Sequence, residues 1–304
     1  MRLRHFGVLQ LLLTGAALLL VLALAVACGD DDNETTGSAT PAKSGTPTKA
    51  AASSGTPIDV SAVPELSDGE LLIGSDIAYP PIESYEEGTN KEVGLDIDIA
   101  KALAAEMGVT VKFEQVADFA GIVGDLTSKR YDIVMSAISI TEERQAKIDF
   151  VPYFGPVGTG ILVAKGNPSN LKKLEDLCGL KVAAQVGTYQ VDQMKALNDD
   201  ACKAKPIDIQ TFPDNPAAVQ ELTLGRIVAE LSDDPVAAYS ALKSSGKLSL
   251  AATGFESAKY GIGVRKDSTA LKAALEKALK AIQDNGKYDQ ILNDWGQAQF
   301  ALKS

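Results

Sequence analysis

The chain is predicted to belong to the α/β class, because short apolar runs typical of buried strands alternate with segments of helical periodicity. The alternation starts with an apolar run at Leu71–Gly74, and Ile99, Leu103 and Met107 then recur at helical spacing. Repeated alternation of this kind favours largely parallel sheets. The folded part is expected to start near Leu66, and its length suits either one domain or two lobes.

The remaining elements follow in the same order along the chain. Strands are expected where apolar residues form short runs or alternate with polar ones, at 109–116, 131–135, 181–184, 207–212 and 228–231. Helices are expected where the apolar spacing is three to four residues, at 120–129, 190–197, 217–224, 269–285 and 288–302. No internal repeat and no glycine-rich phosphate-binding loop is evident in the sequence.

Residues 1–27 have the three-part layout of a secretory signal, with two early arginines and an apolar run from Val8 to Val26. The cysteine that follows, Cys28, resembles that of a bacterial lipoprotein lipobox, although Ala25 stands where that pattern prefers Leu, Val or Ile. The resemblance implies lipidation of Cys28 and anchoring on the outer face of the cytoplasmic membrane. An uncleaved membrane anchor is the alternative, because the apolar run is nearly long enough to span a bilayer.

Residues 28–65 are interpreted as the lipidated cysteine followed by a linker. From Gly29 to about Pro57 the chain consists mostly of Gly, Ser, Thr, Pro, Ala, Lys and Asp. Such a composition buries too little apolar surface to offset the entropy of ordering, so a disordered tether is expected.

The charge balance limits the partners. The chain has 40 Asp and Glu against 29 Lys and Arg, for a net charge of −11 at pH 7. Nucleic acids and anionic lipid surfaces require basic surface, so neither is an expected partner. The single histidine, His5, lies in the predicted signal, which leaves no Ser-His-Asp or Cys-His constellation and no histidine metal site. No cofactor or metal is expected, and the composition disfavours an enzyme.

Two cysteines remain after Cys28, namely Cys178 and Cys202. In an oxidising compartment they most simply form one disulfide. Two buried free thiols are the alternative. A catalytic thiol is disfavoured because no histidine is present to activate it.

Five sequence elements resemble those of the polar-amino-acid solute-binding proteins of ABC importers, known as solute-binding protein family 3. In family order they are Gly94-Leu95-Asp96-Ile97-Asp98-Ile99 with Leu103, Ala104 and Met107, then Ser139-Ile140-Thr141-Glu142-Glu143-Arg144, and then 179–189, 225–233 and 261–266. The resemblance implies a two-lobed, periplasmic-binding-protein-like (type II) fold with a hinge of two crossing strands. Lobe 1 would comprise 66–155 and 257–304, and lobe 2 would comprise 156–256.

The same resemblance implies a site for a free amino acid. Burying its carboxylate and its ammonium is costly unless each group meets an opposite charge. The matching residues are Arg144 for the carboxylate, with Ser139 and the backbone at Thr188 beside it, and Asp233 for the ammonium. Because Arg144 and Asp233 belong to different lobes, one zwitterion would bridge the lobes and favour closure.

Further matching positions concern the ligand's side chain. Tyr79 and Phe119 match an aromatic pair that sandwiches it, and Asp76 matches an acid that binds basic or amide groups. Two rings and a carboxylate suit a long cationic side chain, so a basic or glutamine-like L-amino acid is expected. Ala137 and Gln185 complete the predicted ligand-binding set.

Plainer interpretations remain open for each residue. Arg144 could simply follow a helix N-cap at Thr141, and Asp233 could belong to a turn that ends a strand. Tyr79 and Phe119 could be core residues.

The leading interpretation is a monomeric, lipid-anchored binding protein that delivers a polar amino acid to an ABC permease. A secreted enzyme resembling cyclohexadienyl dehydratases is one alternative, with Asp76 or Glu83 as the acid catalyst. A ligand-binding sensory domain is another. The presence of both Arg144 and Asp233 favours recognition of a zwitterion.

Overall fold

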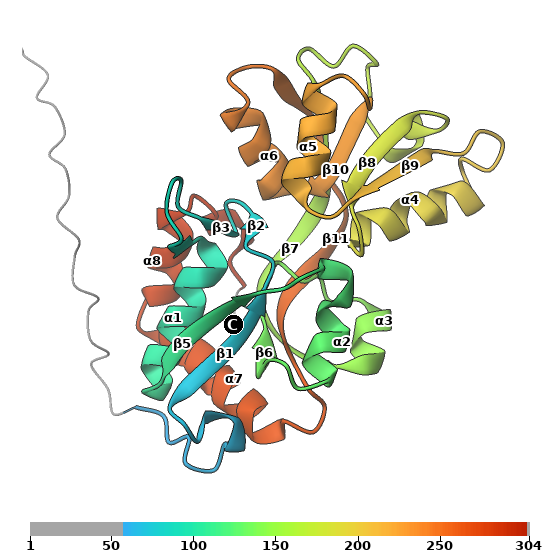
Figure 1. The fold of residues 1–304 in the computed structure, drawn as a ribbon. Coiled ribbons are helices and arrows are strands. Elements are labelled where there is room, and N and C mark those ends of the chain that lie inside the picture. Colours follow the sequence, from blue (N-terminus) through green and yellow to red (C-terminus); the bar gives the residue numbers. More distant parts are fainter. Residues whose placement is uncertain (1–56, 303–304) are drawn as a thin grey trace, which may run out of the picture. The chain divides into compact units, whose positions relative to one another are not determined.

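The computed structural model describes residues 57–302. The predicted signal at residues 1–27 and Cys28 lie outside the described residues. The described chain forms one eight-stranded sheet, ordered β5-β1-β6-β11-β7-β10-β8-β9, and one three-stranded sheet, ordered β2-β3-β4 (Figure 1). Within residues 57–302 no helix has the length and apolar character that crossing a membrane requires.

The strands of both sheets are β1 (Glu70–Ser75), β2 (Ala78–Tyr79), β3 (Glu83–Tyr85), β4 (Glu92–Val93), β5 (Thr110–Gln115), β6 (Ile133–Val134), β7 (Asp149–Ala164), β8 (Lys181–Gln185), β9 (Asp208–Phe212), β10 (Ala229–Asp233) and β11 (Leu248–Val264). The α-helices are α1 (Leu95–Met107), α2 (Ile122–Thr127), α3 (Glu142–Lys147), α4 (Tyr189–Asp199), α5 (Asn215–Thr223), α6 (Asp234–Lys243), α7 (Thr269–Asp284) and α8 (Lys287–Asp294). Short 3-10 turns are η1 (Pro64–Leu66), η2 (Phe119–Gly121), η3 (Leu174–Leu177) and η4 (Ala298–Phe300).

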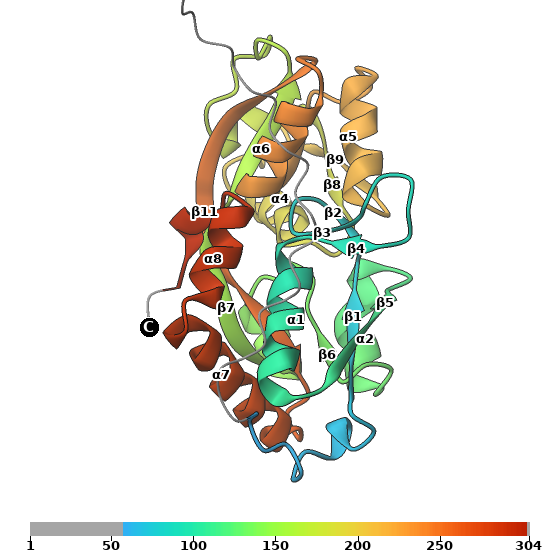
Figure 2. The same cartoon turned by 90° about the vertical axis from the view of Figure 1, so that its left-hand side faces the viewer.

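The two longest strands, β7 and β11, pass through both halves of the large sheet (Figures 1 and 2). They pair antiparallel from Leu248 opposite Ala164 to Val264 opposite Asp149, with register shifts in the middle of the ladder. Strands β5, β1 and β6 lie on one side of them in the sheet order, and β10, β8 and β9 lie on the other. The α/β fold with two lobes and two crossing strands is therefore confirmed.

Lobe 1 has helices on both faces of its part of the sheet. Helices α1, α7 and α8 lie side by side (Figure 2) and pack their apolar residues with those of β1 and β11 in one core. Helix α7 illustrates the pattern, since Leu271, Leu275, Ala278 and Ile282 are all buried at helical spacing. A second core includes Ile122 and other residues from α2 to β6.

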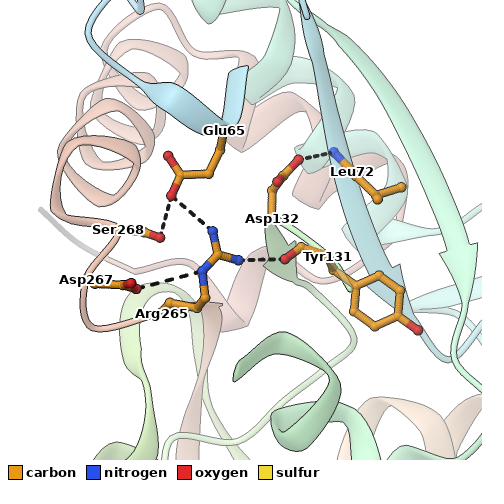
Figure 3. Close-up of polar contacts among 7 residues, drawn as sticks. All are labelled: Glu65, Leu72, Tyr131, Asp132, Arg265, Asp267 and Ser268. Carbon is orange, nitrogen blue, oxygen red and sulfur yellow. Dashed lines mark hydrogen bonds and ion pairs between the residues drawn. The ribbon is translucent and has the colours of Figure 1, made fainter. Parts of the chain in front are cut away.

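The N-terminal residues of the described chain also contact lobe 1. Ile58 and Val60 pack against its larger core, and Val63 is buried in it. Arg265, at the end of β11, donates to the carboxylate of Glu65 at 3.0 Å and to the carbonyl oxygen of Tyr131 at 2.7 Å (Figure 3). These contacts join the first, middle and last segments of lobe 1.

Lobe 2 is built on the same plan from one continuous segment. One core joins η3 and α4 to β8 and β10, and another joins α5 and α6 to the opposite face. Cys178 directly follows η3 and is bonded to Cys202 beyond α4. The predicted disulfide is confirmed.

Sequence patterns missed several elements, among them β2, β3, β4, β7 and α6, and extended one helix too far. Pro152, Pro156 and several glycines obscure the strand pattern of β7, and helix α6 was not predicted. The predicted helix 288–302 is wrong beyond Asp294, because Gly296 adopts a φ of +67° that ends the helix.

Candidate functional site

A cavity lies between the lobes and is lined by residues of both. Its open volume is about 20 Å³, which is room for about one water molecule, so the two walls lie close together. The structure brings all nine predicted ligand-binding residues to its wall, namely Asp76, Tyr79, Phe119, Ala137, Ser139, Arg144, Gln185, Thr188 and Asp233. Four more residues complete the lining, namely Glu83, Ser136, Tyr189 and Gln190.

Arg144 is the one cation among the described residues that line this cavity. Its backbone N–H donates to the hydroxyl of Thr141, the N-cap of α3, at 3.3 Å. Its guanidinium donates to the carbonyl oxygens of Ser139 at 2.8 Å and Gly187 at 3.0 Å. The guanidinium carbon also lies 5.6 Å from the centre of the Phe119 ring. Arg144 therefore belongs both to a capped helix and to the cavity wall.

Asp233, the last residue of β10, presents a buried carboxylate with three donors. Tyr79 and Tyr260 donate their hydroxyls to Oδ2 at 3.1 and 2.8 Å, and Gln190 donates Nε2 to Oδ1 at 2.9 Å. Burial raises the pKa of Asp233 to about 6, although these hydrogen bonds favour the ionised form. The charge of Asp233 in turn favours the protonated form of Arg144, whose pKa burial lowers.

Asp76 follows β1 and lies on the wall formed by lobe 1. Its carboxylate accepts hydrogen bonds from the side-chain amides of Gln115, at 2.9 Å, and Gln185. Gln185 belongs to β8 in lobe 2, so this contact joins the lobes. Burial raises the pKa of Asp76, and the two amides oppose that shift.

The N-terminus of α4 forms part of the wall of lobe 2. Gly187 has a φ of +76°, and Thr188 is the N-cap residue. The hydroxyl of Thr188 donates to the carbonyl oxygen of Gln185 at 2.7 Å, so it does not cap the helix. The first backbone N–H groups of α4 are thereby left without a side-chain acceptor, an arrangement suited to an anion.

Sequence reasoning missed Ser136 and Gln190 and treated Glu83 only as a potential acid catalyst. Ser136 follows the short strand β6, and Gln190 follows the predicted Thr188 by two residues. Their positions beside predicted site residues were the available signals. Nothing in the sequence around Glu83, which comes shortly after Pro80 and Pro81, indicated that this charged side chain would be fully buried.

Among the residues that the structure describes, no group of three His, Cys, Asp or Glu side chains is placed to hold a metal ion. The cavity instead presents one cation, three acids, hydroxyls and amides. Groups of these kinds bind small charged molecules through hydrogen bonds and ion pairs.

Comparisons place this arrangement among known proteins. The family described as bacterial extracellular solute-binding proteins, family 3, matches residues 71–298. The L-cystine-binding protein TcyJ of Escherichia coli is 30% identical over 227 residues, which cover 75% of this chain and 82% of TcyJ. A solved structure of an ancestral arginine-binding protein bound to glutamine is 37% identical, with a TM-score of 0.69, and the match covers 75% of this chain and 98% of that one. The ancestral amino acid-binding protein AncCDT-1, a precursor of cyclohexadienyl dehydratase, is 34% identical, with a TM-score of 0.66 and coverage of 77% and 99%.

Proposed function

Because this chain belongs to the bacterial extracellular solute-binding proteins of family 3, we propose that it binds one free polar L-amino acid between its lobes and delivers it to an ABC permease. The observation that carries the proposal is that Arg144 of lobe 1 and Asp233 of lobe 2 line one cavity. A zwitterion presents one partner to each of these charges, so its binding would favour the closed arrangement of the lobes.

The ligand's carboxylate would pair with the guanidinium of Arg144, and the N-terminus of α4 would supply further hydrogen-bond donors. Arg144 now donates to two backbone carbonyls, and its planar fork can turn the same N–H groups to a carboxylate. The ligand's ammonium would pair with the carboxylate of Asp233. Ser139 and Ala137 would complete the site around the ligand's backbone.

The ligand's side chain would lie near Asp76, Tyr79 and Phe119, beside Gln185. An acid flanked by aromatic rings suits a basic side chain, and the two amides beside Asp76 also suit a glutamine-like one. A solved relative, the ancestral arginine-binding protein bound to glutamine, supports the same two classes.

We further propose that the protein performs no chemistry on its ligand. An acid catalyst needs a proton held where a substrate can accept it. Of the two candidate acids, Asp76 accepts hydrogen bonds from two side-chain amides, which are too weakly acidic to supply it with a proton, and Glu83 is 0% exposed and bonded to Ser136. AncCDT-1, named as an amino acid-binding protein and as a precursor of a dehydratase, leaves the enzyme as the second candidate. Product analysis after prolonged incubation with a cyclohexadienyl acid distinguishes the two functions, since a binding protein returns that compound unchanged.

We propose that the protein acts as a monomer outside the cytoplasmic membrane and is anchored by lipid on Cys28. The signal-like residues 1–27 and the lipobox-like position of Cys28 support the anchor. Metabolic labelling with a radioactive fatty acid tests it, because Cys28→Ser should abolish the label. Equal labelling of both proteins would contradict the anchor, and light scattering of the soluble domain tests the monomer.

A thermal-shift screen of the twenty amino acids, followed by calorimetry, tests the proposed function. A ligand at 100 times its Kd should add about 2.7 kcal/mol to the free energy of unfolding. Asp76→Asn should weaken the binding of arginine or lysine at least tenfold more than that of glutamine, because it removes only the charge. Equal losses for all three ligands would reject the proposed role of Asp76. No shift with any amino acid would reject the function.

A further inference from the structure

Two acidic residues at the cavity wall of lobe 1 have fully buried carboxyl groups. Glu83 of β3 and Asp96 of α1 are 0% and 1% exposed. Oε1 of Glu83 accepts from the hydroxyl of Ser136, Oε2 has no hydrogen-bond partner among the described residues, and the negative charge of Asp96 acts on Glu83. A buried carboxyl with an unpartnered oxygen, beside a second acid, favours the protonated form, because two neighbouring carboxylate ions repel each other.

The surrounding donors indicate which oxygen carries the proton. Asp96 accepts from the hydroxyl of Tyr153 at 2.6 Å and from the backbone N–H of Ala137 at 2.9 Å. Among residues 57–302, the one hydrogen-bond donor to Glu83 is the hydroxyl of Ser136, at 2.9 Å. Asp96 is therefore the better stabilised anion, and Glu83 is the acid. Burial raises the pKa of Glu83 well above its ordinary value and that of Asp96 to about 7.

The pair also holds the cavity wall in place. Ala137 has a φ of +47°, which is uncommon for a residue with a side chain. The carboxyl of Asp96 accepts a hydrogen bond from the backbone N–H of Ala137 and so stabilises this conformation. The hydroxyl of Ser136 donates to Glu83 and accepts from the backbone N–H of Asp76 at 2.9 Å. Hydrogen bonds through Ser136 thus link Glu83 to Asp76, the residue proposed to recognise the ligand's side chain.

Three negative charges from different elements act on Glu83, while Arg144 is the one cation among the described residues of the same lining. The three negative charges are those of Asp96 of α1, Asp76 after β1 and Asp233 of β10. The phenols of Tyr153 and Tyr79 stay neutral, because burial raises the pKa of each well above its ordinary value. A cation that entered this cavity would favour ionisation of Glu83.

We propose that Glu83 and Asp96 are positioning residues that share one proton in the ligand-free protein, and that a ligand with a cationic side chain releases this proton when it binds. The proposal rests on the proposed function, because it needs an amino acid in this cavity. The O–H bond of Glu83 breaks, the proton passes to the solvent, and the ligand's second positive charge offsets the charge gained by the pair. A neutral side chain leaves the proton in place.

Calorimetry at pH 7 in two buffers of different ionisation enthalpy counts the protons released. With arginine, the unaltered protein should release about one half to one proton per ligand, and with glutamine close to none. Glu83→Gln should abolish the release with arginine. Glu230→Gln is a matched control, because Glu230 is also 0% exposed, has a pKa raised by burial to about 8, and is bonded to Asn215 and Ser232 outside the cavity lining. This control should release as many protons as the unaltered protein.

The outcomes separate the proposal from the function on which it rests. If arginine binds without releasing a proton, the proposal of a shared proton is overturned while amino-acid binding stands. The same holds if Glu83→Gln releases as many protons as the unaltered protein. Binding limited to neutral amino acids would overturn the coupling, and the absence of any binding would overturn both. Carbon NMR of the ligand-free protein gives a second measurement. The carboxyl signal that Glu83→Gln removes should lie at the protonated position at pH 7, and an ionised position there would contradict the proposal.

Discussion

Tyr79 of lobe 1 and Asp233 of lobe 2 exchange two hydrogen bonds across the cavity. The hydroxyl of Tyr79 donates to the carboxylate of Asp233 at 3.1 Å and accepts from its backbone N–H at 3.0 Å. The aromatic wall residue of lobe 1 therefore contacts directly the acid proposed to bind the ammonium. The described arrangement of the lobes is stabilised by a contact that lies within the proposed site.

The first prediction concerns this contact. Tyr79→Phe keeps the ring but removes both hydrogen bonds, so the closed arrangement of the ligand-free protein should lose about 1–2 kcal/mol relative to open ones. Small-angle X-ray scattering should detect a larger radius of gyration without ligand and an unchanged one with ligand. Tyr288→Phe is the control, because the hydroxyl of Tyr288 donates within lobe 1, to the carbonyl oxygen of Tyr153. Equal radii for all three proteins would contradict the prediction.

The second prediction concerns Arg144. Arg144→Ala removes the partner of a buried carboxylate and should cost about 2–5 kcal/mol of binding free energy. Calorimetry with the best ligand of the screen measures the loss. Arg226→Ala serves as the control, since Arg226 is exposed and pairs with Glu221 in lobe 2. An unchanged affinity after Arg144→Ala would remove this residue from the site.

Much of the fold followed from local patterns, because most of its elements are short and have one buried face. Helix α7 is an example, since its buried residues recur at helical spacing, and strand β8 was found as a short apolar run. Strand β7 was different. Its 16 residues pass through both lobes, so nearly continuous burial together with prolines and glycines replaces the alternation expected of a half-buried strand.

The site shows a similar limit. Arg144 and Asp233 were predicted because a resemblance supplied their roles, and local propensity alone would have left them in a helix and a turn. The effect of the Asp96 charge on Glu83 depends on how β3 meets α1, a tertiary arrangement that no local pattern encodes. Buried acids are uncommon without a partner, so their presence is informative only once burial is known.

The third prediction concerns the close approach of the lobes at Gly187. A Cβ there would lie 2.5 Å from Cα of Ala120 in lobe 1. Gly187→Ala should therefore oppose closure and weaken ligand binding at least tenfold. Gly166→Ala is a matched control, because Gly166 has nearly the same φ, +77° against +76°, and no atom within 4 Å of its Cβ position. Equal affinities of the two variants would show that the lobes close without this contact.

The fourth prediction concerns the disulfide of lobe 2. The bond joins residues 24 positions apart, and a loop of this size restricts the unfolded chain by about 3 kcal/mol. Replacing Cys178 and Cys202 together by serine should lower the free energy of unfolding by about that amount. Hydrogen exchange should increase in α4 and β8 and stay constant in α1 and α7. An unchanged melting temperature after loss of the disulfide would contradict this expectation.

The last prediction concerns the cost of keeping Asp233 buried. Its pKa is about 6 in the folded protein against an ordinary value of 3.8, so the folded state holds the proton more tightly. The free energy of unfolding of the ligand-free protein should therefore fall as the pH rises from about 4 to 6. The full decrease, at most about 3 kcal/mol, should be reached above pH 6. Asp233→Asn should remove most of this pH dependence and raise the melting temperature at pH 7.5, while amino-acid affinity falls at least a hundredfold. Denaturant titrations at pH 4.5 and 7.5 measure the first effect, and calorimetry measures the second. A variant that is less stable than the unaltered protein at both pH values would show that the hydrogen bonds from Tyr79, Tyr260 and Gln190 outweigh the cost of burying the charge.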